Sequence, residues 1–504
     1  MARNLDIYNY IKDNKTYLIG LLIFTVLFMV VYSTSTSFLY DYPETSDSFV
    51  FQVIGKFWLQ GAIPYRDLYD NKGPFLYAMN ALGYWLTGNK TGVLLTQIPF
   101  FFATGLITFH FLQIGFNKTQ SFWLSIVLLL GLSYGFNGGN NACEHSLPLL
   151  MLSFYLFYRW LNQAIEKQNS HPLRYSFIYG VSIGLCMMTR PSNAIVILLI
   201  IAYITLFLLV NKQFKNLLKN LLWIALGSLA ICLPFILYFL VKDSLGDFYY
   251  ALFLSNMHYL KNTGILESPM YLKRALALIS SYINCLMFIP IGLLLICSKD
   301  HRKHGVIWLL MGTICILFFL RTNCYPHYAH ICLPFAVIGL LELKAIYKNI
   351  NLNRCLRYAC YSITIFLISF SSFNGVYTLI KNAIHDDSSQ KALYAAYDTI
   401  FKDIPKGTDE SFACYGCLPE MLLRWNLRPC YRFFALQGFS RYYNQDVYEK
   451  TNQEFINGDA KWVLLNHWKG VPREIKEVLE EKYQPIKELS TTDGLLVLYK
   501  RKNL

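Results

Sequence analysis

The feature that most constrains this chain is a series of apolar runs long enough to cross a lipid bilayer. A membrane-spanning helix needs about 20 mostly apolar residues, because the hydrocarbon core is roughly 30 Å thick. Only 15% of the residues are charged, whereas 55% are hydrophobic. The sequence therefore predicts an α-helical, polytopic membrane protein. About eleven candidate transmembrane helices occur, at residues 17–39, 91–112, 121–138, 145–161, 175–189, 192–210, 221–241, 275–297, 305–320, 327–343 and 358–379.

The distribution of Lys and Arg sets the expected orientation. The formal net charge is +14, from 45 basic and 31 acidic residues. A charge of this size in a soluble domain would suggest nucleic acid, but the basic residues here concentrate in alternate segments between the apolar runs. Cytoplasmic loops of membrane proteins carry such an excess of positive charge. We therefore expect a multi-pass cell (inner) membrane protein with a cytoplasmic N-terminus and no nucleic-acid partner.

The composition of the chain changes towards its C-terminus. Residues 1–380 hold the apolar runs, whereas residues 381–504 regain charges. Residues 460–468 and 494–502 have the pattern of short strands, and residues 473–483 have the pattern of a helix. The sequence predicts a transmembrane domain over 1–380 and a small C-terminal α/β domain over 381–504. An odd number of spans makes this second domain extracytoplasmic.

The cysteines of the C-terminal segment allow two interpretations. Cys414 and Cys417 form a CxxC, and Cys430 follows, but no second pair completes a zinc ribbon. In an oxidising compartment a disulfide is an alternative. The sequence leaves open whether these thiols pair.

The first outside loop, residues 40–74, is the most informative stretch for chemistry. Its segment SFVFQVIGKFWLQG is amphipathic and predicts a helix lying along the membrane surface. Residues 75–88 are apolar but short, and they are interpreted as a juxtamembrane or half-inserted helix. This order places a base and a phosphate-binding cation at one membrane face. The loop holds five carboxylates and three cations: Asp41, Glu44, Asp47, Asp67, Asp70, Lys56, Arg66 and Lys72.

The remaining outside loops place ionisable groups at the ends of expected spans. Arg190 and Arg321 are candidate ligand contacts, although long basic side chains also anchor helix ends at the membrane surface. His327 and His330 are either phosphate or metal contacts or ordinary hydrogen-bonded histidines. The residues concerned are Glu144, His145, Arg190, His258, Lys261, Arg321, His327, Tyr328 and His330.

The first loop resembles that of the polyprenyl-phosphate-sugar glycosyltransferases of the GT-C class, and most of all the protein mannosyltransferase and aminoarabinose transferase family (glycosyltransferase family 39-like). The family pattern is an acidic residue soon after the first span, a surface helix, G-x-x-P-Y-x-D and a K-[GP]-P turn. Here these are Asp47, GAIPYRD over 61–67, and KGP over 72–74. The match covers roughly the first 150 residues, and the remainder agrees in layout alone. The Asp-Glu pair common in the family is absent, because Asp47 is followed by Ser48.

The resemblance implies a GT-C-like fold and an inverting glycosyltransferase. Such an enzyme moves a sugar from a polyprenyl-phosphate carrier to an acceptor hydroxyl or phosphate at the outer face of the membrane. The acceptor would be a glycan, a lipid or a protein. No cofactor is implied with certainty, and a divalent metal is an open option.

The same resemblance assigns candidate roles to individual residues. Asp47 and Glu144 would be catalytic, with Asp47 as the base, and Glu144 with His258 would be candidate metal ligands. Asp47, Lys72 and Glu144 would converge on one outward cavity. Substrate and phosphate contacts would come from Lys72, Arg66, Asp67, Tyr65, Arg321, His327 and Tyr328.

Three other classes remain as alternatives. A transporter or flippase for lipid-linked glycans would place charges in the middle of its spans, whereas those of this chain fall at expected span ends. A lipid-linked polysaccharide polymerase or ligase would have a similar composition but no acidic first loop. A non-enzymatic membrane scaffold gives no reason for the carboxylates of that loop.

Overall fold

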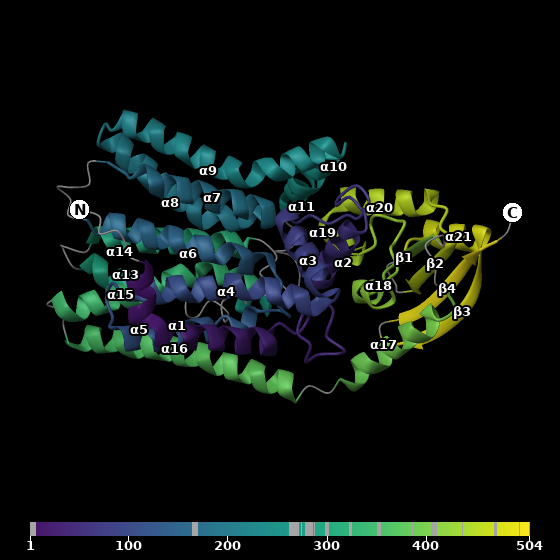
Figure 1. Ribbon diagram of the computed structural model, residues 1–504, viewed down its shortest axis with the longest axis horizontal. Helices are drawn as coiled ribbons and strands as arrows, with labels where there is room; N and C mark the ends of the chain where they lie inside the picture. The colour runs from purple at the N-terminus through teal and green to yellow at the C-terminus, as the bar shows by residue number, and fades with distance from the viewer. Residues whose placement is uncertain are drawn as a thin grey trace. The chain divides into compact units, whose positions relative to one another are not determined.

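The chain divides into two compact units, each of which is built from separate stretches of sequence (Figure 1). The first unit comprises residues 1–33, 94–234 and 265–383, and the second comprises residues 34–93, 235–264 and 384–504. The computed structural model describes residues 7–163, 170–261, 272–273, 275–277, 286, 288–297, 302–321, 325–349, 354–384, 387–404, 411–435, 437–467, 471–492 and 494–502.

The first unit is a bundle of helices (Figure 1). Helices suit such apolar sequences because each one satisfies its backbone hydrogen bonds internally. In chain order its elements are α1 (Ile7–Tyr32), α4 (Lys90–Leu112), α5 (Lys118–Leu130), η1 (Ser133–Gly135), α6 (Ala142–Leu161), α7 (Leu173–Thr189), η3 (Pro191–Ala194), α8 (Ile195–Val210), α9 (Phe214–Val241), α13 (Phe288–Cys297), α14 (Arg302–Leu320), η6 (Pro326–Cys332), α15 (Leu333–Asn349) and α16 (Arg354–Ala383). Helix α4 begins, and α9 ends, in the second unit.

Helix α6 lies at the centre of this bundle. Its side chains Phe154, Phe157 and Trp160 are almost completely buried in the apolar core. Helices α7 and α9 approach closely, because a Cβ at Gly180 would lie 2.1 Å from the carbonyl oxygen of Ile224. Small residues at helix crossings are the usual means of close packing in membrane bundles.

Seven helices of the described chain are long and apolar enough to cross a membrane. They support a multi-pass membrane protein, but the expected number of about eleven is not confirmed. Helices α5 and α7 have only 13 and 17 residues. The expected span at 275–297 lies only partly within the described residues, as α13. The seven are Asn9–Tyr32, Lys90–Leu112, Pro191–Val210, Phe214–Val241, Arg302–Leu320, Pro326–Ala345 and Tyr361–Asn382.

The second unit contains a mixed four-stranded sheet in the order β1-β2-β4-β3. Strands β1 (Phe412–Tyr415) and β2 (Trp462–His467) are parallel, and β4 (Gly494–Arg501) runs antiparallel to both β2 and β3 (Tyr483–Thr491). The other elements of this unit are α2 (Asp47–Leu59), α3 (Pro74–Thr87), α10 (Leu245–Tyr249), the π-helical η4 (Tyr250–Leu254), α11 (Ser255–Lys261), α17 (Ser388–Phe401), α18 (Pro419–Trp425), α19 (Gln437–Tyr443), α20 (Gln445–Asn457) and α21 (Arg473–Lys482).

The α/β character predicted for the C-terminal segment is confirmed. Strands β2 and β4 and helix α21 lie where the sequence predicts them. Strand β1 has only four residues and β3 is largely exposed, so neither carries the apolar alternation that marks a strand. The loop over residues 40–74 belongs to the same unit, and the amide of Tyr69 donates to the carbonyl of Arg432 at 2.9 Å.

Candidate functional site

Asp47 is the first residue of α2, the helix predicted from the amphipathic part of the first loop. Its side chain is exposed, whereas the next ten residues of the helix are nearly all buried. A Cβ at Gly55 would lie 2.6 Å from Cβ of Asn80, so α2 is packed tightly against α3. Gln52 donates to Oγ of Ser48 at 3.0 Å, which holds the first turn. A rigid helix thus presents an exposed carboxylate.

The G-x-x-P-Y-x-D segment forms a tight turn after α2. Tyr65 has a left-handed backbone conformation with φ of 71°, and its amide donates to the carbonyl of Leu68 at 2.8 Å. Asp67 closes the turn, because its Oδ2 accepts from the amide of Ile63 at 2.8 Å. Partial burial raises the pKa of Asp67, but the hydrogen bonds from Arg66 and Ile63 outweigh burial and hold it below its ordinary value.

Lys72 is held by the tyrosines that flank it. The Tyr65 hydroxyl donates to the Lys72 carbonyl at 2.7 Å, and the Tyr77 hydroxyl lies 3.0 Å from the same oxygen. The ammonium of Lys72 donates to Oδ1 of Asn71 at 2.7 Å. The side chain of Lys72 is half-buried. Its backbone is therefore fixed, and its charge stays accessible on one side.

Asp70 is a buried carboxylate beside Lys72 that the sequence did not single out. Its Oδ2 lies 2.9 Å from the Tyr77 hydroxyl, and only 1% of the residue is exposed. Burial raises the pKa of Asp70, the charge of Lys72 opposes this shift, and the charge of Asp47 adds to it. Asp47 and Lys72 thus both lie close enough to Asp70 to act on it electrostatically. The available signal was the apolar pair Leu68-Tyr69 before Asp70, which indicates burial.

Glu144, in the first unit, stabilises the start of α6. The preceding residues Asn137, Gly138, Gly139 and Asn140 all have positive φ, from 48° to 82°. The Glu144 carboxylate accepts from the amides of Asn141 at 3.1 Å and Asn140 at 3.3 Å, and it completes a capping box. It also accepts from Nε2 of Gln97 at 2.8 Å. Both of its oxygens therefore hold the turn before the helix.

The pKa of Glu144 is set by two opposing effects. Its carboxyl lies just before the expected span at 145–161 and is buried. Burial raises its pKa from 4.5 to about 7, and the three hydrogen bonds that it accepts work against this shift. The group is thus poised to change charge near neutral pH.

Arg190 and η6 lie in the same region of the first unit. The guanidinium of Arg190 lies 3.4 Å from the centre of the Tyr328 ring, a cation–π contact. Arg190 and Glu144 both interact electrostatically with the thiol of Cys143. The His327 ring lies 4.7 Å from the Tyr328 ring, edge to face.

The other two candidates of this region have simpler surroundings. Arg321 is exposed at the end of α14. Nε2 of His330 lies 3.0 Å from the carbonyl oxygen of Leu132, and the ring is buried. This contact favours an ordinary hydrogen-bonded histidine over a ligand contact for His330.

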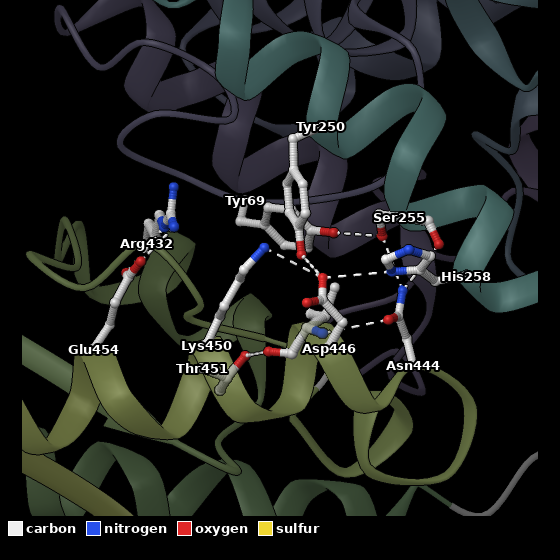
Figure 2. Close-up of polar contacts among 11 residues, drawn as sticks. Tyr69, Tyr250, Ser255, His258, Arg432, Asn444, Asp446, Lys450, Thr451 and Glu454 are labelled. Carbon is white, nitrogen blue, oxygen red and sulfur yellow. Dashed lines mark hydrogen bonds and ion pairs between the residues drawn. The ribbon is translucent and has the colours of Figure 1, made fainter.

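His258 belongs to a polar cluster of the second unit (Figure 2). Its Nδ1 lies 3.6 Å from Oδ2 of Asp446. The same oxygen accepts from the Tyr250 hydroxyl at 2.6 Å and from Nζ of Lys450 at 3.2 Å. Within the described ranges, no three His, Cys, Asp or Glu side chains are grouped as metal ligands. His258 and Glu144 belong to different units, and their roles as metal ligands stay predictions.

The predicted site residues thus fall into two groups. Asp47, Tyr65, Arg66, Asp67, Lys72 and His258 belong to the second unit, and Glu144, Arg321, His327 and Tyr328 belong to the first. The expected convergence of Asp47 and Lys72 with Glu144 joins the two units and stays a prediction. Cys414 and Cys417 are buried thiols, and Cys430 is an exposed one.

Comparison with known proteins identifies both a family and a fold. The model of the competence-induced Ccs4 N-terminal domain family matches residues 9–371. No curated protein matches the chain. The structure of ArnT from Cupriavidus metallidurans bound to undecaprenyl phosphate has a TM-score of 0.55, with 10% identity over 95% of this chain and 97% of that chain. The apo state of ArnT also gives 0.55, with 11% identity over 96% of this chain and 98% of that chain.

A second type of enzyme has a similar structure. The oligosaccharyltransferase of Archaeoglobus fulgidus, in complex with Zn and sulfate, has a TM-score of 0.54, with 13% identity over 95% of this chain and 72% of that chain. At such low identity these likenesses show the fold. The predicted GT-C-like fold is therefore confirmed.

Proposed function

Because the chain belongs to the competence-induced Ccs4 N-terminal domain family and has the fold of ArnT, we propose that it is a membrane glycosyltransferase with a lipid-linked sugar donor. The observation that carries the proposal is that the Tyr77 hydroxyl joins the Asp70 carboxylate to the backbone of Lys72, in the same unit where the exposed Asp47 begins α2. The ArnT structure of the same fold was solved with undecaprenyl phosphate, a polyprenyl phosphate. We infer that this chain takes a polyprenyl-phosphate sugar at the outer face of the membrane.

The reaction is a single displacement. An acceptor hydroxyl attacks the anomeric carbon, the bond from that carbon to the phosphate oxygen breaks, and the configuration inverts. Asp47 accepts the proton of the acceptor, because its carboxylate is exposed at the start of a rigid helix. A positioned base contributes about 10²–10⁴ in rate.

Lys72 stabilises the leaving phosphate. Its backbone is fixed by two tyrosine hydroxyls and its ammonium donates to Asn71, so the ammonium is positioned before the charge develops. Preorganised electrostatic groups of this kind are worth about 10²–10³ in rate when one is removed. Asp70 is buried beside Lys72, and the charge of Lys72 opposes the rise that burial gives the pKa of Asp70.

The residues of the first unit take supporting roles in this proposal. Glu144 positions the loop before α6, since both of its oxygens hold backbone or amide groups there. His327 and Tyr328 contact substrate beside Arg190, and Arg321 stays a proposed phosphate contact. The acceptor is a glycan, a lipid or a protein, and the donor sugar is a hexose or a pentose.

Lys72→Ala in the full chain tests the proposal. Binding of undecaprenyl phosphate to the purified protein in detergent is measured by native mass spectrometry, with Lys476→Ala on the exposed face of α21 as the matched control. We expect Lys72→Ala to weaken binding by at least about tenfold, since one charge-assisted contact is worth roughly 1.5–3 kcal/mol. Lys476→Ala should leave it unchanged. Equal binding by both variants would remove Lys72 as the phosphate site.

A transfer assay separates an enzyme from a transporter. Vesicles containing the protein receive a radiolabelled undecaprenyl-phosphate sugar and glycan, lipid or peptide acceptors in parallel. A glycosyltransferase gives labelled product and free undecaprenyl phosphate. Movement of the intact lipid across the bilayer without product would favour a flippase.

A further inference from the structure

The second unit contains a cavity that the proposed reaction does not use. Its volume is about 760 Å³, within the range of roughly 300–1,000 Å³ typical of small-molecule sites. Its walls come from the turn after α2, the segment 428–432, the C-terminal end of α20 and the adjoining sheet. Among its described lining residues, Asp47, Asp70 and Lys72 do not appear.

The charged groups around the cavity are paired and balanced. Arg66 and Arg428 both contact Asp67, at 2.9 Å and 3.7 Å. On another wall, Nε of Arg432 donates to Glu454 at 2.9 Å. Arg432 also contacts Asp247, at 3.2 Å. A phosphate or another polyanion would have to displace these carboxylates, whereas an uncharged ligand would not.

The apolar part of the lining includes three aromatic side chains. Tyr431, Phe455 and Tyr483 are buried and line the cavity, and the rings of Tyr431 and Phe455 lie 5.3 Å apart, edge to face. Planar guanidinium and carboxylate groups make paired hydrogen bonds with neighbouring hydroxyls, and aromatic rings pack against C–H faces. A molecule with many hydroxyls and no charge, a saccharide, has this combination of surfaces.

The wall formed by α20 is anchored at its other end. Asn444, the N-cap of α20, donates to the Ser255 hydroxyl and carbonyl at 3.0 Å. Tyr250 donates to Asp446 at 2.6 Å, and Lys450 lies 3.7 Å from the centre of the Tyr250 ring. Figure 2 shows Glu454 further along the same helix, next to Arg432. The cavity is thus pre-formed, which lowers the ordering cost of binding.

We propose that this cavity binds an uncharged oligosaccharide, through the Arg428–Asp67 and Arg432–Glu454 pairs and the aromatic wall. That this oligosaccharide is part of the acceptor rests on the proposed function, whereas the binding itself does not. The chain then recognises its acceptor through residues other than Asp47, Asp70 and Lys72.

Cys430 reports directly on occupancy, because its exposed thiol lines the cavity. The full chain in detergent is alkylated with a maleimide, and the modified peptides are quantified by mass spectrometry. The probes are maltotetraose, mannotetraose, chitotetraose, a tetrasaccharide of uronic acids, and inorganic phosphate. Cys297 and Cys355, exposed thiols of the first unit, are internal controls.

We expect at least one uncharged tetrasaccharide to slow alkylation of Cys430 and to leave Cys297 and Cys355 unchanged. At ten times its dissociation constant a probe should slow the reaction about tenfold, by mass action. Protection by none of the uncharged probes, or only by the uronic acid probe or phosphate, would overturn the proposal.

Two variants test the residues named. Arg428→Ala and Glu454→Gln should abolish protection of Cys430 without changing the melting temperature, because both side chains are at least partly exposed. Persistent protection in both variants would also overturn the proposal. The transfer assay is run in parallel. Protection without transfer would support the saccharide site and contradict the proposed enzyme. Transfer without protection would support the enzyme and contradict the saccharide site.

Discussion

Two loops that each carry a predicted catalytic carboxylate use it in opposite ways. Asp47, in the loop over residues 40–74, is exposed at the start of a helix most of whose other residues are buried. Glu144, in the first turn of α6, is buried and accepts hydrogen bonds from two backbone amides and from Gln97. The Glu144 carboxylate completes a capping box, so both of its oxygens face the turn that it holds. Exposure and hydrogen bonding therefore distinguish a reactive acid from one that positions a loop.

The largest expected effect is that of Asp47→Asn. Loss of the base should lower the rate of transfer by about 10²–10⁴. The side chain is exposed, so the melting temperature should be unchanged. Initial rates with a radiolabelled donor in vesicles measure the effect, and Asp41→Asn, another exposed loop carboxylate, is the matched control. A rate for Asp47→Asn equal to that of the control would show that Asp47 is not the base, and its contrast with Glu144 would no longer hold.

The raised pKa of Glu144 should make the stability of the folded protein depend on pH. Its folded pKa of about 7 lies above the ordinary 4.5, so its contribution to stability is full below about 4.5 and is lost as the pH rises through about 7. The whole change is roughly 3 kcal/mol, at about 1.4 kcal/mol per pKa unit. Thermal unfolding between these pH values should show this loss in the parent chain.

Glu144→Gln should lose that pH dependence, since an amide does not titrate. Its transfer rate should fall far less than that of Asp47→Asn. A rate loss as large as that of Asp47→Asn, at unchanged stability, would give Glu144 a direct role in the reaction.

The left-handed loop before α6 should tolerate substitution poorly. Gly139 has φ of +76°, and a Cβ there would lie 2.0 Å from Oγ of Ser33. Gly139→Ala should cost about 1–3 kcal/mol through overpacking, beyond the backbone strain. Gly88→Ala isolates that strain, because Gly88 has φ of +74° and nothing lies within 4 Å of its Cβ position. The two melting temperatures should therefore differ, and equal values would mean that Ser33 moves aside freely.

The sequence predicted the features that repeat along the chain and missed those made by tertiary contact. Apolar length identified a membrane protein, and period-two patterns located β2 and β4, because both signals are local. The motif residues of the first loop indicated the fold. Asp70 was listed among the loop carboxylates, but its burial was not predicted, because this depends on Tyr77 and on helix packing. The capping role of Glu144 depends likewise on the four left-handed residues before α6, which no periodicity marks.

The smallest effect, and the sharpest test of how the first loop is held, is that of Tyr77→Phe. The Tyr77 hydroxyl contacts both Asp70 and the Lys72 carbonyl, whereas Tyr65 still donates to that carbonyl. One net hydrogen bond is worth about 0.5–1.5 kcal/mol, so transfer should fall about 2–10-fold. Tyr84 lies in α3 like Tyr77, and its hydroxyl donates to Oε1 of Gln52 at 3.2 Å. Tyr84→Phe is therefore the control for stability alone. If Tyr77 positions Lys72, the loss should appear as weaker undecaprenyl phosphate binding in Tyr77→Phe and not in Tyr84→Phe. Equal binding by both variants would show that Tyr65 alone fixes the lysine, and that the buried Asp70–Tyr77 contact serves the fold of the loop.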